Sequence, residues 1–301
     1  MILKPRNETE ELNLLRCLNR KMRLHSKDYS HFLNLEKGLT GEKLFDERLG
    51  ELPDEWIIIN DLLLEYRNTI FQIDSLLITG DCVYIFEVKN YDGDYYIEQD
   101  RWYTASNNEV KNPLLQLQRS ESLLRRLLQE LGCKSPLKAL LIFINPEFHL
   151  YHSTINFPAI FPAQINRFMD KLKMKSQPPN KIHFKLAETL MSLHLEKTSF
   201  DRRPEYTYEG LEKGISCLSC KTFLAPLNKL NMICPKCGII EDITHAVTRS
   251  VDEYKLLFPE QKITTASIQE WCKTIHSKKT IRRALVNNFD LINTGRSTHY
   301  K

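Results

Sequence analysis

Four polar residues, two of them acidic, interrupt a pair of apolar segments that are otherwise typical of buried β-strands. The segments run over residues 70–79 and 82–88, and Gly80-Asp81 between them is the signal of a two-residue hairpin turn. Because such a turn fixes the register, and side chains alternate along a strand, the four polar side chains are expected on one face. They form two directly opposed pairs, Asp74 with Glu87 and Gln72 with Lys89.

The expected distance between the two acids determines their chemistry. Directly opposed Cβ atoms in a hairpin lie about 4.5–5.5 Å apart. Two carboxylates that close, in apolar surroundings, repel each other strongly unless one takes a proton or a cation lies between them. With Lys89 two residues after Glu87, the residues form an Asp…Glu-x-Lys set, the arrangement that divalent-metal phosphodiesterases use. This set predicts a nuclease.

A surface hairpin with solvated charges or a structural salt bridge is the alternative interpretation. Such a hairpin would alternate apolar and polar residues, whereas both faces of this one are apolar. Strands that are apolar on both faces are usually covered on both sides. Charged residues at such positions are rarely fully buried unless they are paired, which favours the metal site. The expected acid-bearing face carries Leu76, Ile78, Val83 and Ile85, and the other face carries Ile73, Leu77, Tyr84, Phe86 and Val88.

Around these strands the sequence resembles the NERD domain (nuclease-related domain), a branch of the PD-(D/E)XK nuclease-like superfamily. The resemblance covers about residues 36 to 145, and it rests on the order and spacing of several short motifs. These are Gly41-Glu42, Asn60-Asp61, Gln72-Ile73-Asp74, Glu87-Val88-Lys89-Asn90-Tyr91 with Gly93, Trp102 and Asn112-Pro113-Leu114-Leu115-Gln116.

The resemblance implies roles for individual residues. Asp74 and Glu87 would hold a divalent ion, Mg²⁺ or Mn²⁺, with Lys89 beside the attacking water and Glu42 as an acid carried by a helix. We expect Gln72 to position Lys89 or the metal ligands. Gln116 and Gln118, on the following helix, are expected to reach the phosphate.

A second metal site is indicated by four regularly spaced cysteines. Cys217-x-x-Cys220 is followed after thirteen residues by Cys234-x-x-Cys237-Gly238. Two such turns, each offering two thiolates, build a tetrahedral Zn²⁺ site, and four sulfur ligands make the zinc structural. Redox-active cysteines are the competing interpretation, but one pair would suffice for that chemistry. The segment resembles a zinc ribbon, which either contacts nucleic acid or a partner or only braces a domain.

The last residues of the chain predict a DNA-binding element. Residues 273–301 hold seven Lys or Arg against the single acid Asp290, more surplus charge than the +4 of the whole chain. Thr265 and Ser277 are expected to cap two short helices, which resemble a winged helix-turn-helix with a wing over 289–300. A solvated basic helix, or a helical bundle that binds a protein, is the alternative. The expected DNA-binding residues are Lys278, Lys279, Arg282, Arg283 and Arg296, with Gln116 from the nuclease-like part.

Helical periodicity and apolar runs supply the elements that position these residues. Helices are expected at 8–24, 36–49, 113–131 and 185–195, and strands at 56–62, 70–79, 82–89 and 137–145, with a short hairpin at 95–103. The expected fold is α/β, a mixed central sheet flanked by helices (PD-(D/E)XK-like), plus a small zinc ribbon and an α-helical helix-turn-helix-like tail. The expected domains are an N-terminal helical extension (1–35), the nuclease-like domain (36–197), a linker (198–214), the zinc ribbon (215–240) and the tail (241–301). No chemistry is assigned to 146–184.

Composition narrows the class of protein. Of the 301 residues, 42% are hydrophobic and 27% charged, which is usual for a globular protein. No apolar run approaches the roughly 18 residues of a membrane span, and the N-terminus lacks the apolar core of a signal peptide. We therefore expect a cytoplasmic nuclease with DNA as partner, RNA remaining open and no membrane. The alternative is a non-catalytic DNA-binding regulatory or scaffold protein with a nuclease-like fold.

Overall fold

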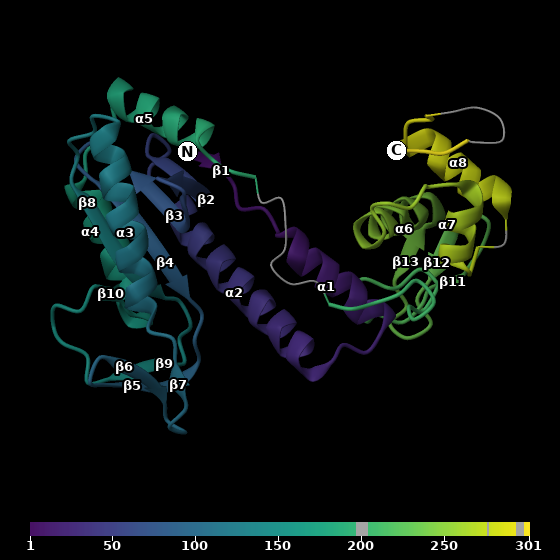
Figure 1. Ribbon diagram of the computed structural model, residues 1–301, viewed down its shortest axis with the longest axis horizontal. Coiled ribbons are helices and arrows are strands. Elements are labelled where there is room, and N and C mark those ends of the chain that lie inside the picture. Colours follow the sequence, from purple (N-terminus) through teal and green to yellow (C-terminus); the bar gives the residue numbers. More distant parts are fainter. Residues whose placement is uncertain (197–203, 276, 293–297) are drawn as a thin grey trace. The chain divides into compact units, whose positions relative to one another are not determined.

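The chain divides into two compact units. The computed structural model describes residues 1–196, 204–275, 277–292 and 298–301. Unit 1 comprises Met1–Glu8 and Asn34–Phe200, and unit 2 comprises Thr9–Leu33 and Asp201–Lys301. The N-terminal extension expected over residues 1–35 is therefore divided between the two units. Residues 1–8 belong to unit 1 and residues 9–33 to unit 2. Figure 1 labels the elements of both units.

Unit 1 is built on a six-stranded mixed sheet. The antiparallel strands β2, β3 and β4 form its centre, β1 is parallel to β2, and β8 and β10 continue the sheet in parallel beyond β4. This agrees with the expected mixed sheet. The strands are β1 (Ile2–Lys4), β2 (Ile57–Tyr66), β3 (Thr69–Ile78), β4 (Val83–Lys89), β8 (Leu137–Phe143) and β10 (Ala159–Ile160).

Helices cover both faces of this sheet. On one face α3 (Pro113–Glu130) and α5 (Lys181–Ser192) pack on a core that includes Leu76 and Val83. On the other face α2 (Ser26–Gly50) and α4 (Ile165–Lys175) pack on a core that includes Leu77 and Phe86. Burial of both faces explains why the central strands are apolar on both sides. Helix α2 begins ten residues before the expected start at 36.

A smaller four-stranded sheet follows β4 in the chain. The expected short hairpin is confirmed, since Ile97 pairs with Trp102. Residues 146–184, which had no assignment from the sequence, supply β9 to this sheet and β10 to the main one, followed by a 3₁₀ turn (Pro162–Gln164) and α4. The order is β7-β6-β5-β9, with β5 (Gly93–Glu98), β6 (Arg101–Thr104), β7 (Glu109–Val110) and β9 (Phe148–Tyr151).

The register expected from the Gly80-Asp81 turn is confirmed, but the sheet face expected for the Ile73 side chain is wrong. Ile78 pairs with Val83, and the same register continues to Ser75 opposite Phe86. Ile73, however, packs in the core of Leu76 and Ile78 instead of that of Leu77. The alternation is interrupted next to Asp74, where the opposite position on β2, Asp61, has a left-handed backbone with φ of 51° and regular pairing is missing.

Among its described residues, unit 2 combines a small sheet with four whole helices and the first residues of α2. Its elements are α1 (Glu10–Lys21), β11 (Ala225–Pro226), β12 (Asn231–Ile233), β13 (Ile240–Asp242), α6 (Ile243–Leu257), α7 (Thr265–Cys272) and α8 (Lys278–Asn288). Ser277 caps α8 as expected, but α7 is capped by Thr264 instead of Thr265. The reason is reciprocal hydrogen bonding, since Thr264 Oγ1 accepts the backbone N–H of Ser267 while the Ser267 hydroxyl oxygen accepts that of Thr264. Within the described residues, every helix is too short or too polar to cross a membrane.

Candidate functional site

Asp74 and Glu87 lie at the point where the hairpin of β3 and β4 opens. Both residues are buried, with an exposure of 7% for Asp74 and 2% for Glu87. The regular pairing of the two strands ends at Ser75 and Phe86, so Asp74 and Glu87 are the next positions of the same register. Beyond that point the Asp74 carboxylate accepts the backbone N–H of Val88 at 2.9 Å. The side chain thus satisfies a buried backbone donor of the opened strand.

Lys89 is held between β4 and α3. Its ammonium lies 2.6 Å from Glu87 Oε1 and donates to the side-chain oxygen of Gln116 at 3.3 Å. Burial alone would lower the pKa of Lys89, but the carboxylates of Glu87 and Asp74 raise it above its ordinary value. Lys89 therefore remains a cation. Gln118, two residues further along α3 than Gln116, is exposed to solvent, so the structure brings only Gln116 to Lys89.

Glu42 reaches the same site from α2, whose close approach depends on a glycine. A Cβ atom on Gly41 would lie 2.5 Å from the Cβ of Asn90 and 3.1 Å from the side chain of Ile144, so any larger residue would push the helix away. Asn90 in turn donates from its side-chain amide to the carbonyl of Lys37 in α2 at 2.8 Å. These contacts fix the helix on the end of β4, one residue after the lysine of the site.

Arg6 binds Glu42 and had no role assigned from the sequence. Its guanidinium, 3% exposed, donates to Glu42 at 2.8 Å and to both oxygens of Asp46 at 2.9 and 3.0 Å. It also donates to the backbone carbonyl of Asp74 at 2.7 Å and to the hydroxyl of Ser75 at 3.1 Å. Arg6 therefore joins α2 to β3 at Asp74.

Asp61 adds a further carboxylate to those of Asp74, Glu87 and Glu42. The side-chain amide of Gln72 donates to it at 2.7 Å, and the ammonium of Lys4 lies 3.8 Å away. Burial is the main cause that raises the pKa of Asp74, and the negative charge of Asp61 adds to this effect. The structure thus places Gln72 against Asp61, a residue that the sequence resemblance included without assigning it a function.

Burial shifts the carboxyls of Glu87, Glu42 and Asp74 toward their protonated form by raising the pKa of each. The pKa of Glu87 and that of Glu42 are each raised to about 7, first by burial and then by the charge of Asp74. Burial also raises the pKa of Asp74, although Lys89 and the Val88 N–H oppose this effect. Acids with such pKa values need either protons or a compensating cation at neutral pH.

The carboxylates are nevertheless not gathered as tightly as a complete ligand set. Among the described residues, the only group of three or more Cys, His, Asp or Glu whose ligand atoms all lie within 4.8 Å of one another is made of cysteines. Each of the three acids has a protein partner instead: Glu42 is bound by Arg6, Glu87 by Lys89 and Asp74 by the backbone N–H of Val88. Carboxylate oxygens are the donors that Mg²⁺ and Mn²⁺ prefer, and Mg²⁺ usually keeps several waters with only one or two carboxylates. Asp74 and Glu87 fit that requirement.

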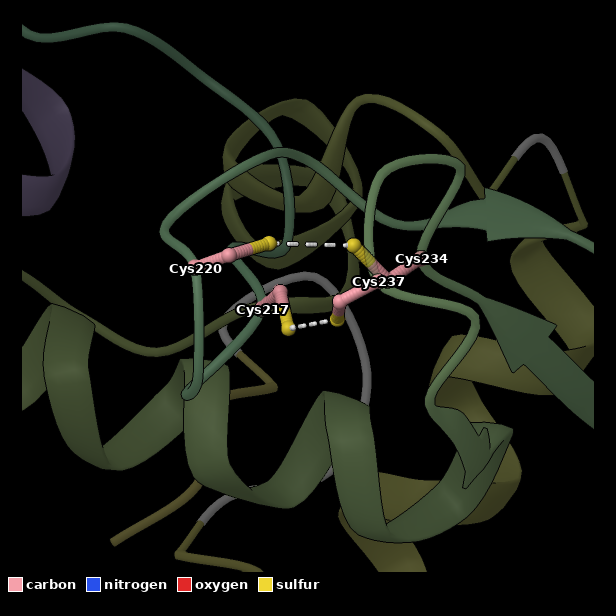
Figure 2. A group of neighbouring side chains, drawn as sticks. All are labelled: Cys217, Cys220, Cys234 and Cys237. Carbon is pink, nitrogen blue, oxygen red and sulfur yellow. Dashed lines mark hydrogen bonds between the residues drawn. The ribbon is translucent and has the colours of Figure 1, made fainter.

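The cysteine group lies in unit 2, where two tight turns bring four thiols together (Figure 2). Sγ of Cys217 lies 3.6 Å from Sγ of Cys237, and Sγ of Cys220 lies 3.3 Å from Sγ of Cys234. A tetrahedral ion with metal–sulfur bonds of about 2.3 Å has sulfur–sulfur edges of about 3.8 Å, close to this spacing. The geometry therefore fits a four-sulfur metal site.

Each cysteine pair sits in a turn with a left-handed residue. Lys221 has φ of 65° after the first pair, and Gly238 has φ of 74° after the second. The backbone N–H groups of these two residues donate to the carbonyls of Cys217 and Cys234 at 3.1 and 2.9 Å. Only the glycine adopts this conformation without steric cost, so Gly238 marks the turn in the sequence and Lys221 does not.

Four of the seven basic residues of the tail lie on α8, whose inner face is apolar. Ile281 and Leu285 are buried, while the predicted DNA-binding residues of this helix, Lys278, Lys279, Arg282 and Arg283, are all exposed. After α8, the backbone of Asp290 pairs with that of Lys301, and Tyr300 pairs with both Leu291 and Ile263. Arg296 lies outside the described residues.

Comparison with known proteins supports one part of unit 1. Residues 37–144, just over a third of the chain, match the family model of the nuclease-related domain. Searches of curated proteins and of solved structures found no match. The matched segment contains Glu42, Asp61, Asp74, Glu87 and Lys89 but excludes Arg6.

Proposed function

We propose that the chain is a divalent-metal-dependent nuclease that hydrolyses phosphodiester bonds in DNA, and that unit 1 has a PD-(D/E)XK-like architecture. The observation that carries this proposal is the pair of buried acids, Asp74 and Glu87, beside the charged Lys89. The match of residues 37–144 to the nuclease-related domain supports it independently.

Asp74 and Glu87 are the residues that would hold Mg²⁺ or Mn²⁺. When bound, the ion polarises the scissile phosphate and lowers the pKa of a coordinated water. Glu42 and Asp61 add negative charge to the cluster and so favour a cation there. In the metal-free protein Glu42 and Glu87 take up protons, because burial raises the pKa of each carboxyl.

In the proposed mechanism, Lys89 supplies the positive charge that faces the phosphate of the substrate. A preorganised cation in a water-poor site stabilises the charge that develops on the phosphate during attack. Glu87 and Gln116 hold the ammonium from β4 and α3, so its position is fixed before substrate binds. Gln72 acts through Asp61, which it orients with a hydrogen bond of 2.7 Å.

Unit 2 would supply DNA affinity. The four cysteines would hold one structural Zn²⁺, since four sulfur ligands leave no position for substrate. We propose that α7 and α8 form a helix-turn-helix, whose second helix presents Lys278, Lys279, Arg282 and Arg283 to DNA. Their exposure on α8, opposite its apolar face, supports this role.

The rival function is a regulatory or scaffold protein that binds DNA without cutting it. One observation favours it, because Glu42 and Glu87 each already have a cationic protein partner. In that function the ion pairs of Glu42 with Arg6 and of Glu87 with Lys89 are structural contacts.

Cleavage of defined substrates distinguishes the two functions. The purified chain is incubated with circular duplex DNA, linear duplex DNA and RNA, in Mg²⁺, in Mn²⁺ or in a chelator. The proposal expects metal-dependent cleavage of DNA, lost in Asp74→Ala and kept in Asp170→Ala, which removes an exposed acid from α4. DNA binding without cleavage in any of these conditions would support the rival function.

A further inference from the structure

The first eight residues bring two cations into the carboxylate cluster of unit 1. Strand β1 lies parallel to β2, with Ile2 opposite Ile58. Lys4, only 8% exposed, donates to the carbonyls of Asn60 at 2.9 Å and of Asp61 at 2.8 Å. This pairing fixes β1 on the edge of the sheet. It thereby places Arg6, two residues after Lys4, within reach of Glu42.

Arg6 is bound as a fixed part of the cluster. Its planar guanidinium binds Asp46 with two parallel hydrogen bonds and Glu42 with a third, while a fourth reaches the Asp74 carbonyl. Arginine provides this forked geometry and lysine does not. The guanidinium is only 3% exposed, and the carboxylates of Glu42 and Asp46 with which it pairs are partly buried.

The charges of the cluster then leave room for one divalent ion. With every carboxyl of the site ionised, the ion pairs and charge interactions in the described part of the chain link five carboxylates to three cations, a surplus of two negative charges. The carboxylates are Glu42, Asp46, Asp61, Asp74 and Glu87, and the cations are Lys4, Arg6 and Lys89. One dication neutralises this surplus, whereas a second would leave a buried positive charge of equal size.

We propose that Arg6 is a built-in cation of the active centre, which occupies Glu42 and Asp46 and limits the site to one divalent ion held by Asp74 and Glu87. The inference rests on the proposed metal site and specifies its capacity. It also makes residues 1–8 part of the active centre, although they lie outside the segment that matches the family model. Arg6 acts here as a positioning residue, because it holds Glu42 and the backbone of Asp74.

Counting bound Mn²⁺ tests this role without measuring activity. Binding to the full, zinc-loaded chain is titrated by calorimetry and by the electron paramagnetic resonance of free Mn²⁺, and the binding that persists in Asp74→Asn is subtracted. We expect one ion in the wild type and one in Arg6→Lys, which keeps the charge. Arg6→Gln should bind a second ion, because Glu42 and Asp46 lose their cation and the surplus rises from two to three negative charges, so a second ion leaves a single positive charge instead of two. Arg48→Gln, which changes an exposed arginine of α2, should bind one.

Two Asp74-dependent ions in the wild type, or one ion in Arg6→Gln, would overturn the inference. If circular dichroism shows that Arg6→Gln does not fold, Arg6→Lys decides: one ion supports the role of the charge, and two ions overturn it. A wild type that binds no Asp74-dependent ion contradicts the proposed metal site itself. The failure of the inference and the failure of the proposed function therefore give different results.

Discussion

The carboxylate of Asp74 accepts the backbone N–H of Val88, 2.9 Å away, one step beyond the last regular pair of β3 and β4. A side chain thus takes the place of a backbone acceptor at the point where the strands separate. This arrangement keeps the backbone donor satisfied while it opens the hairpin next to Glu87. The same residue that is proposed to bind the ion also stabilises the opening in which the ion would lie.

The stability of the metal-free protein should fall as the pH rises. Glu42 and Glu87 have pKa values raised to about 7, mainly by burial, against an ordinary value of 4.5. The folded chain therefore binds more protons than the unfolded chain between these values, and its stability decreases as the pH increases through this window. Because one pKa unit corresponds to about 1.4 kcal/mol, we expect a loss on the order of 1 kcal/mol or more.

Urea unfolding in a chelator, from about pH 5 to about pH 8, measures this loss. The pH dependence should be weaker in Glu87→Gln, which removes one of the two titrating groups, and weaker in the wild type with Mg²⁺. An equal pH dependence in the wild type and in Glu87→Gln would show that Glu87 is already ionised in the metal-free protein.

The purified chain should carry one tightly held zinc in unit 2. Structural zinc binding is coupled to folding, so removing a ligand should unfold the region of the four cysteines. Cys234→Ser should therefore lose zinc in elemental analysis, whereas Cys133→Ser, a cysteine of unit 1 outside the cluster, should retain it. Stoichiometric zinc in Cys234→Ser would contradict the four-sulfur site.

The register of β3 and β4 could be predicted because it is determined locally. A two-residue turn at Gly80-Asp81 fixes every pair that follows, and the pairing of Ile78 with Val83 confirms it. The face of Ile73 could not be predicted in this way. The irregular backbone at Asp61 belongs to β2, and no residue pattern within β3 indicates this irregularity.

Arg6 could not be recognised from the sequence for a related reason. The charged N-terminal segment has the composition of a solvated end, and only the pairing of β1 with a strand more than fifty residues later buries it. Asp61, by contrast, followed an apolar strand within the family resemblance. The Asn60-Asp61 motif of that resemblance was the available signal, but Asp61 lies inside β2, and its proximity to Asp74 needed the structure.

A buried ion pair should make α1 essential to unit 2. Lys21 is 0% exposed, its ammonium lies 3.2 Å from Glu253 in α6, and the ring of Trp271 lies 4.8 Å below it. Removing one partner of a buried pair costs about 3–5 kcal/mol, so Glu253→Gln should destabilise unit 2 by this amount. Lys21→Met combined with Glu253→Gln should cost less, because no buried charge remains unpaired at position 21. Thermal unfolding that is unchanged in Glu253→Gln would show that the pair contributes little.

The basic face of α8 should dominate the affinity for DNA. Each phosphate contact contributes about −0.9 to the log–log slope of affinity against salt, so removing four basic side chains should flatten the slope and weaken binding by several kcal/mol. The variant changes Lys278, Lys279, Arg282 and Arg283 to Ala, and its matched control changes the exposed α4 residues Arg167, Lys171, Lys173 and Lys175 to Ala.

The control removes the same net charge from unit 1 and should change the slope much less. Fluorescence anisotropy with a short DNA duplex over a range of salt concentrations provides the measurement. If the α8 variant keeps the affinity and salt slope of the wild type, the helices of the tail bind a protein or brace unit 2 instead.

The most direct test of the account is the rate at which Glu87→Gln cuts duplex DNA in Mg²⁺. The substitution preserves the size of the side chain and removes one charge from the proposed metal site. We expect cleavage to fall by at least about a hundredfold, as is common when one stabilising group is removed, while the melting temperature shows a folded protein. Glu188→Gln, which changes an exposed acid on α5, should cut like the wild type. Undiminished cleavage by Glu87→Gln would contradict the account.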